Sequence, residues 1–414
     1  MTIEVHSVQR LRVWSESSFA TDGTGTLANY TDVPMREGSG TMTLTLDSLD
    51  PMQQVQSRYE YREEVLGKRS ATLQFTLNLA PTGTAAAAST AAVQGALGLI
   101  LKATMGGETL GTGTTFTGGT ATQPTVTSAA GFAAGGAIGW VNASGILEVR
   151  EIESIASTTI TLKHAFSGAP QNTNVAYAAA TYYFTEDPQE SLQFIVEGVE
   201  NEDRWLLLGG QAVGGVTLAI DPSGAALPSV QFSMTFANWK SSAETAGTIT
   251  GTLGTSTYSN YAPIVGFAGE LRAFTVGAST LVTSSLVHCS ALSFAPKIAY
   301  VPVTSPSGTN TVYRWRASRV SPPVEGSFTT FFSDYTWWNA RANKTDVDIA
   351  YQMGQAAGSA ALITAPTVQI INPQRVADGN QLAGQTVAFK GRRDTDTGAS
   401  TTALAKAPVR IHLV

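Results

Sequence analysis

Apolar and polar residues alternate in short runs along much of the chain, a pattern that predicts β-strands. Two groups of runs form matching hairpins, at 216–236 and 368–389. Each begins with an alternating strand, from Val216 or Val368, and continues through an Asp-Pro or Asn-Pro turn and a Gly-containing connection into a second alternating strand. A repeat of this size predicts two related β domains in one polypeptide. Internal duplication favours a symmetric assembly over chemistry.

The segments before each hairpin also recur in order. The first half predicts strands at 40–46 and 70–79, a helix at 85–105 and a strand from Leu192. The helix carries an apolar stripe that predicts packing on a sheet. The second half predicts strands from His288 and Ser327, a short helix at 334–344 and a strand at 346–353. Strand, long connection, strand, helix, strand and hairpin therefore occur twice.

These patterns predict a mainly β fold with two tandem β-sandwich domains, each with a flanking helix, and a small β insertion domain. The insertion contains short strands at turn-like spacing, which is typical of a small barrel or sandwich. The predicted divisions are the first domain at 1–107 and 187–240, the insertion at 108–186, a linker at 241–262 and the second domain at 263–414.

One predicted connection is unusually long and charged. It runs from Asp47 to Arg69 and holds the densest charge cluster in the chain. Loops longer than about 12–15 residues without secondary structure are uncommon unless they function or are disordered. Contact with a partner is the interpretation we favour, and a solvated hairpin extension is the alternative.

Composition limits the classes of function. Charged residues make up only 14% of the 414 residues, against about 25% in average globular proteins. A surface so poor in charge favours coverage by further copies of the chain, with a secreted, Thr/Ser-coated β protein as the alternative. The net charge of −6 argues against a DNA-binding surface. The single cysteine, Cys289, excludes an intrachain disulfide framework.

Targeting and membrane signals are also weak. Residues 1–14 lack an apolar leader segment, and the weakly polar stretch 85–103 is too polar for a membrane span. The sequence therefore predicts a protein made in a cytoplasm, without a membrane anchor.

Residues with catalytic potential are scattered, and we expect no enzyme activity, no cofactor and no metal. The histidines are His6, His164, His288 and His412, and none stands at metal-ligand spacing from another. Cys289 follows His288, but neighbours in a strand face opposite sides, which disfavours a Cys–His dyad. The pairs Asp346/Asp348, on a strand, and Asp394/Asp396, in a polar loop, are predicted to be solvated, with a divalent-ion site as the alternative.

A local acidic excess has two interpretations. In an enzyme it could supply paired carboxylates, and in a tubular assembly it could line a lumen and repel phosphates. Its residues are Glu186, Asp187, Glu190, Glu197, Glu200, Glu202 and Asp203.

Taken together, these residues resemble the tail tube (major tail) protein of long-tailed bacteriophages, in a duplicated-domain form. The resemblance is carried by the loop 47–69 between strands 40–46 and 70–79, by the following helix, and by 205–213 leading into 216–236. It implies sandwiches with a flanking helix that form a ring, whose inner strands continue between subunits into a closed β-barrel. It also implies that the long loop contacts the adjacent ring.

Because the family ring contains six single domains, the duplication implies three chains per ring with pseudo-sixfold symmetry. Strands from Leu192, Val216, Val347 and Val368 are the barrel candidates, and the insertion 108–186 would lie outside the tube. The second domain's counterpart of the loop is 302–323. The implied ring-stacking residues are Arg58, Glu60, Arg62, Glu63, Glu64, Lys68 and Arg69.

The resemblance also implies partners and a location. The partners are further copies of the chain, a tape-measure protein and tail-tip or terminator proteins, while DNA passes through the lumen without specific binding. The protein would be assembled in the host cytoplasm and reside in the virion tail.

Two other classes compete with this interpretation. A tail terminator, baseplate hub or capsid decoration protein would form a single ring or cap. A carbohydrate-binding or hydrolytic β protein could stack sugars on aromatic side chains, for which the candidates are Tyr313, Trp315, Trp337 and Trp338. Isolated aromatic residues in strands more often belong to the core.

Overall fold

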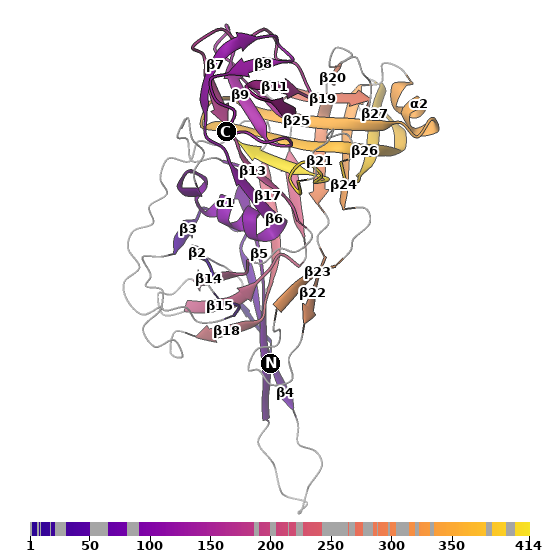
Figure 1. Ribbon diagram of the computed structural model, residues 1–414. Coiled ribbons are helices and arrows are strands. Elements are labelled where there is room, and N and C mark those ends of the chain that lie inside the picture. Colours follow the sequence, from indigo (N-terminus) through magenta and orange to yellow (C-terminus); the bar gives the residue numbers. More distant parts are fainter. Residues whose placement is uncertain are drawn as a thin grey trace, which may run out of the picture.

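A computed structural model describes the chain in segments. They are residues 2–5, 8, 10–16, 18–20, 30–49, 65–80, 91–185, 190–198, 204–213, 215–220, 227–241, 264, 270–275, 285–287, 289–296, 299–303, 314–318, 323–331, 335–377, 383–394 and 402–414. Strands dominate these segments, which contain two helices, so the predicted mainly β class is confirmed (Figure 1). No helix within these segments is long and apolar enough to cross a membrane.

The largest element is a sheet of 15 strands, called here the long sheet. Its main path is β1 (Thr2–Val5), β4 (Thr41–Leu49), β5 (Val65–Asn78), β17 (Ser229–Phe236), β16 (Val216–Ile220), β21 (Cys289–Pro296), β24 (Val324–Phe331), β27 (Ala383–Gly391), β26 (Ser359–Ala377), β25 (Asp346–Ala356), β19 (Glu270–Thr275) and β20 (Ser285–Val287). Three further strands branch from it: β28 (Arg410–Leu413), β13 (Ala180–Phe184) and β6 (Gly106–Leu110).

The long sheet contains two blocks of four strands with the same internal order. One block runs β4-β5-β17-β16 and the other runs β21-β24-β27-β26. If the four strands of a block are numbered along the chain, their order across the sheet is first, second, fourth, third in both blocks. The blocks are joined where β16 pairs antiparallel with β21. One hydrogen-bonded surface therefore crosses from the first half of the chain to the second.

A second pair of strand groups also shares one order. A five-stranded sheet runs β18 (Asn238–Ser241), β15 (Arg204–Gly210), β14 (Leu192–Glu197), β2 (Arg10–Ser15), β3 (Thr31–Val33). In the second half of the chain, pairings link β28 to the first part of β26, then β25, β19 and β20. If the five strands of a group are numbered along the chain, their order across the sheet is fifth, fourth, third, first, second in both groups.

Both hairpins predicted from the alternating pattern are confirmed. Val216 lies opposite Phe232 in β16 and β17, and Ile370 lies opposite Phe389 in β26 and β27. The predicted Asn-Pro turn at Asn372 is wrong, because β26 continues through it to Ala377. A register shift between Ile370 and Asn372 marks a bulge beside the proline. A bulge accommodates a residue that cannot donate to the ladder.

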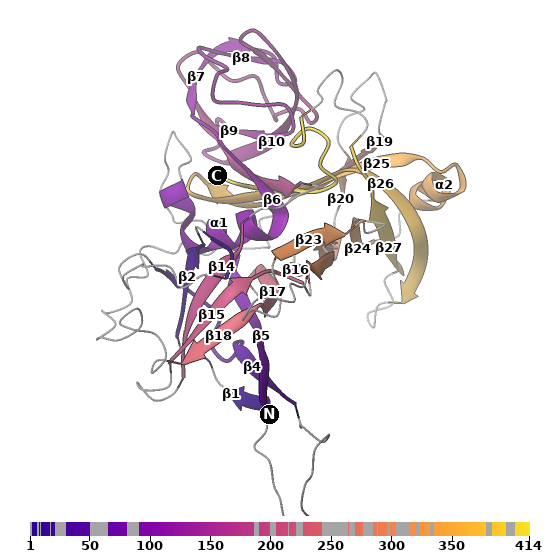
Figure 2. The same cartoon turned by 60° about the horizontal axis from the view of Figure 1, so that its bottom comes forward.

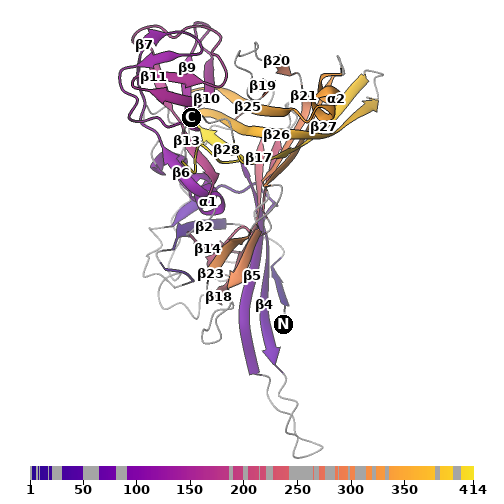
Figure 3. The ribbon, with the colours of Figure 1, turned by 45° about the vertical axis from the view of Figure 1, so that its right-hand side comes forward.

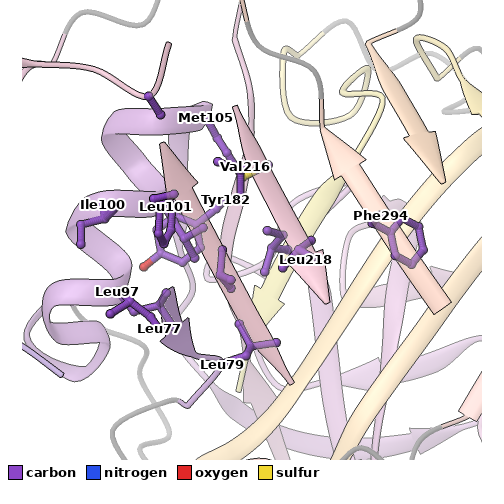
Figure 4. Packing of buried hydrophobic residues seen from close by; sticks show 14 of the residues in the cluster. Leu77, Leu79, Leu97, Ile100, Leu101, Met105, Tyr182, Val216, Leu218 and Phe294 are labelled. Carbon is purple, nitrogen blue, oxygen red and sulfur yellow. The ribbon is translucent and has the colours of Figure 1, made fainter. Parts of the chain in front are cut away.

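Both predicted helices form. Helix α1 (Ala91–Met105) ends where Gly106 adopts a φ of 88°, and α2 (Thr336–Ala342) follows β24. The predicted stripe of α1 is confirmed, because Leu97, Ile100 and Leu101 are buried in the main core. Figure 4 shows Leu97 and Leu101 beside Leu77 of β5 and Tyr182 of β13, while Ile100 points to the other side of the helix.

A closed barrel lies between β6 and β13 in the chain. Its strands run β10 (Leu147–Ala156), β11 (Thr159–Leu162), β8 (Pro124–Val126), β7 (Thr114–Gly119), β12 (Val175–Ala178) and β9 (Ala137–Val141). Phe116, Trp140 and Phe166 belong to a separate core inside it. The chain leaves through β6 and returns through β13, which pair with each other. Figure 2 shows the barrel above one end of the long sheet.

Candidate assembly surfaces

The β4–β5 hairpin projects from the body of the molecule (Figure 3). Its pairing extends from Thr41 opposite Gln74 to Leu49 opposite Val65. Of the predicted ring-stacking residues, Lys68 and Arg69 lie on β5 near this end. The others fall outside the described residues, and they are Arg58, Glu60, Arg62, Glu63 and Glu64.

Arg69 ties this hairpin to β18 within the chain. Its guanidinium lies 4.7 Å from the centre of the Trp239 ring and donates a 3.4 Å hydrogen bond to the Trp239 carbonyl. The Trp239 indole donates in turn to the carbonyl of Thr45 on β4, at 3.1 Å. Trp239, which sequence reasoning did not select, therefore ties β18 to both strands of the hairpin.

Lys68 lies at an irregularity of the same hairpin. The pairing shifts between Leu46 and Ser48, so Asp47 lies opposite both Gly67 and Lys68. A Cβ at Gly67 would meet the Asp47 carbonyl at 2.8 Å, so this position requires glycine. A bulge of this kind increases local twist and redirects the strand.

Two strand edges differ in how they are covered. The outer edge of β4 pairs with β1, four residues long, from Thr2 opposite Thr45 to Val5 opposite Met42. Residues 370–377 of β26 pair with β27 on one side, and helix α2 packs against β26.

Apolar surface gathers beside that β26 edge. Tyr335 is 58% exposed, Trp338 40% and Val376 42%. Helix α2 contains no buried residue. Arg375 of β26 donates a 3.1 Å hydrogen bond to the Tyr335 hydroxyl and lies 5.8 Å from the centre of its ring, which joins the start of α2 to β26. Exposed apolar patches of this kind mark interaction sites more often than isolated residues do.

The aromatic residues considered for sugar stacking are divided by the structure. Trp337 packs edge-on against Phe328 at 5.0 Å and joins the main core. The indole of Trp315, on β23 (Arg314–Ser318), donates to the Gly209 carbonyl at 2.7 Å; this strand pairs with β22 (Ala299–Val303). Only Trp338 is exposed, and Tyr313 lies outside the described residues.

The barrel is joined to the long sheet by a buried ionic cluster. Lys163 of the barrel donates to Asp394 at 2.9 Å and lies 3.3 Å from Glu151 and 3.6 Å from Asp348. Arg410 of β28 pairs with Glu151 and, at 3.0 Å, with Asp394. All of these residues are buried. The prediction that Asp348 and Asp394 are solvated is wrong, because the barrel covers both of them.

His164 and Asp346 differ in their relation to the buried ionic cluster. His164 Nε2 lies 3.3 Å from the Asp348 carboxylate, so this histidine belongs to the cluster. Asp346 instead pairs with Arg392 at an exposed position. Asp396 lies outside the described residues.

Gln352 supplies a second polar contact with the barrel. Its amide donates to the Leu147 carbonyl at 2.7 Å and accepts from the Val149 amide and Arg150 at 2.9 Å. Arg150 also pairs with Glu148 at 3.0 Å. An apolar patch surrounds these contacts and contains Ala137, Leu147, Val149, Ala179, Ala350, Ala360 and Leu362.

Burial and neighbouring charges set the pKa values of two buried groups near the barrel. Burial opposes the charge on Lys163, but the carboxylates of Glu151 and Asp348 outweigh it and raise the pKa of the ammonium above its ordinary value. Burial lowers the pKa of His412 to about 3, so its imidazole is neutral and bonds with Thr181 at 2.9 Å. His6 and His288 lie outside the described residues. Within the described segments, no group of three or more His, Cys, Asp or Glu residues could hold a metal ion.

The acidic excess predicted near 186–203 is described only in part. Glu190 accepts an ion pair from Lys102 at 2.8 Å, and Glu197 pairs with Arg204 at 3.1 Å. Both carboxylates are therefore neutralised within the chain, and the other five acids lie outside the described residues. Comparison of the sequence with protein-family models and with curated proteins finds no match.

Proposed function

We propose that this chain is a structural protein of a bacteriophage tail, which polymerises as stacked rings into the hollow tube through which DNA passes. The observation that carries the proposal is the repeated strand order of the two blocks in the long sheet and their junction at β16 and β21. A chain that joins two like blocks edge to edge already contains one unit of a repeating ring.

The strand order supports two tandem copies of one sandwich. In the first copy, β4-β5-β17-β16 would form one layer and β18-β15-β14-β2-β3 the other. The second copy would use β21-β24-β27-β26 and the group of β28, β26, β25, β19 and β20. Helices α1 and α2 each follow the second strand of their block. The barrel would be an outward decoration inserted into the first copy.

The dimensions suit a DNA conduit. Each chain contributes eight strands from its two blocks. With strands about 4.8 Å apart and tilted by about 40°, a ring of three chains, or about 24 strands, has a backbone diameter of roughly 50 Å. Side chains lining the inside still leave a passage wider than a DNA duplex. Three chains would give pseudo-sixfold symmetry, and closure would remove the sheet edges.

The β4–β5 hairpin would contact the next ring. It projects along one direction from the body and is tied to β18 by the contact of Arg69 with Trp239. A tape-measure protein and terminator or tip proteins would set the tube's length and ends. The virion tail would be its location after assembly in the host cytoplasm.

Negative-stain electron microscopy of the purified, concentrated protein tests this function. Hollow rods of uniform width with a regular axial repeat are expected, and averaged end views should show three chains per ring. Single discs or caps would favour a terminator, hub or decoration protein instead. Persistent monomers in the presence of the phage's tail-tip complex would contradict the tube.

Reversing charges in the hairpin tests ring stacking separately. Arg58→Glu, Arg62→Glu and Lys68→Glu in one chain should prevent rods while leaving the chain folded. Arg69 is left unchanged because it packs within the chain. The matched control is Lys344→Glu, an exposed position beyond α2. Rods of unchanged length in the triple variant would refute the stacking role.

A further inference from the structure

We propose that one face of the long sheet is the wall of the channel and that its charges cancel, so that DNA passes it without electrostatic attraction or repulsion. The proposal rests on the tube function proposed above and specifies how the channel wall interacts with the DNA. It follows from the side-chain alternation and the register of the eight strands in the two blocks.

Alternation divides the side chains of these eight strands between two faces of the sheet. One face carries core residues such as Phe75 and Phe232, whose rings stack at 5.4 Å. Helix α1 and the five-stranded sheet cover this face, because Leu101 and Phe194 belong to the same core. The residues that alternate with the core residues point the other way, and they are called here the polar face.

A continuous row of uncharged residues crosses the polar face from one block to the other. Its members stand opposite one another in register on seven strands, so they lie on the same side of the sheet. The hydroxyls of Ser293 and Ser327 lie 3.3 Å apart in this row, and those of Thr329 and Thr386 lie 3.1 Å apart in a neighbouring row. The row is Asn78, Ser229, Ala219, Ser293, Ser327, Ala388 and Asn372.

Charged residues on the polar face occur in pairs of opposite sign. Glu325 stands opposite Lys390 between β24 and β27, and its carboxylate lies 3.7 Å from the ammonium. Asp47 and Lys68 follow the same alternation at the bulge of the projecting hairpin. Within the described parts of the eight strands, these two acids and two bases are the only charged residues of the polar face, so its net charge is zero.

Other charged residues of the region lie elsewhere. Arg69 and Arg375 are on the core side of the sheet, over the rings of Trp239 and Tyr335 at 4.7 Å and 5.8 Å. Glu197, one of the acids considered for a lumen, lies on β14 of the five-stranded sheet. Hydroxyl and amide groups therefore dominate the polar face.

A neutral wall suits a channel through which DNA must slide. A DNA duplex carries about one negative charge per 1.7 Å of its axis, and lysine or arginine side chains bind its phosphates with release of counterions. A surplus of carboxylates would instead repel the duplex, because a passage with low-dielectric walls focuses the field. Hydroxyl and amide groups exchange hydrogen bonds with water, so a hydrated duplex gains and loses little as it moves along them.

Cysteine labelling in rods tests whether the polar face lines the channel. Gln231 of β17 is exposed on this face. Gln231→Cys, in a Cys289→Ala background, should react in rods with a small maleimide but not with a maleimide coupled to serum albumin, which is too large to enter. The control is Thr117→Cys, exposed on the barrel, which should react with both. Equal albumin labelling of the two variants in rods would overturn the assignment of this face.

Added charge tests the neutrality of the wall. Wild-type rods should not retain a short fluorescent DNA duplex on sedimentation in low salt. Gln231→Lys places three ammonium groups in a ring of three chains and should retain the duplex in a nuclease-protected form. If each meets a phosphate, the affinity should fall about 40-fold between about 50 and 200 mM salt, since the slope is about −0.9 per phosphate. Thr217→Lys, opposite Gln231, is a second variant at the same wall, and Gln231→Asn is the neutral control.

The outcomes separate the neutral wall from the tube. Absence of wild-type rods, seen before any DNA is added, would overturn the tube function and the wall together. Wild-type rods that retain the duplex in a salt-dependent way would overturn the neutral wall and leave the tube function standing. Lysine variants that form rods but retain no more duplex than Gln231→Asn would have the same consequence.

Discussion

Replacement of Lys163 by Met should destabilise the contact between the barrel and the long sheet. The Lys163 ammonium is the only lysine in the described ionic cluster and lies within 3.6 Å of three carboxylates. Met matches the aliphatic stem, so the packing is retained and the charge alone is lost. Afterwards Arg410 still pairs with Glu151 and Asp394, while Asp348 keeps its contact with His164.

The expected magnitude follows from burial. Asp394 is 2% exposed, Glu151 is 0% exposed and Asp348 is 6% exposed, so water screens none of them well. Removing one partner of a buried ion pair costs about 3–5 kcal/mol. We expect about 3 kcal/mol, the lower end, because Arg410 still pairs with Glu151 and Asp394.

The loss should also have a defined pH dependence. The pKa of Lys163 is raised in the folded chain, so its ammonium stabilises the fold fully below the ordinary lysine pKa of about 10.4 and less at more alkaline pH. The difference between wild type and Lys163→Met should therefore be constant through neutral pH and shrink only above that value.

Urea unfolding, followed by tryptophan fluorescence, measures both effects. Adding Asp394→Asn to Lys163→Met should recover part of the loss, since it removes one unbalanced charge. The control is Lys390→Met, whose ammonium is 3.7 Å from Glu325 and 46% exposed. A surface pair of this kind contributes about 0–1 kcal/mol. A loss for Lys163→Met no larger than the control's, or no recovery in the double variant, would refute the reasoning.

Two further changes test other parts of the fold. Burial raises the pKa of Glu16 to about 7, against hydrogen bonds from Ser191, Gly209 and Ala20 that lower it. The wild type should therefore lose roughly 3 kcal/mol of stability relative to Glu16→Gln between about pH 4.5 and 7, because the carboxyl ionises in the unfolded chain while the buried one still keeps its proton; parallel unfolding profiles would contradict this. Gly326→Ala would place a Cβ 2.3 Å from the Phe389 ring and 2.5 Å from the Ser293 carbonyl. It should lower stability by about 1–3 kcal/mol in thermal unfolding, whereas Gly168→Ala, with its nearest contact at 3.6 Å, should have little effect.

The sequence predicted those elements whose pattern is local. Both helices and both hairpins were found because side-chain periodicity and nearby Gly signals identify them. The Asn372–Pro373 turn was misread because a proline usually ends a strand. Pro373 is tolerated inside β26 because a bulge precedes it and because none of the described neighbouring strands needs a backbone N–H from this position. Neither condition can be recognised from the local sequence.

The ionic cluster was missed for a different reason. Lys163 and Asp394 are separated by 231 positions, and each stands in a polar neighbourhood that is typical of solvated loops. Only the return of the barrel onto β26 and β28 buries them. Arg69 shows the same effect on a smaller scale: its charge suggested contact with a partner, while its ring contact is with Trp239, 170 positions away.

The buried charges between the barrel and the long sheet also determine the orientation of the barrel. The barrel has its own core, and the patch around Ala137, Leu147 and Leu362 would hold it against the sheet in several registers, since small apolar surfaces interlock weakly. Buried ion pairs add little net stability but penalise every arrangement that leaves a charge unpaired. The contacts of Lys163, Arg410 and Gln352 therefore select one orientation. In the proposed tube, a barrel repeated around every ring would need such a fixed orientation, because any variation between copies would place barrels of neighbouring chains in conflict.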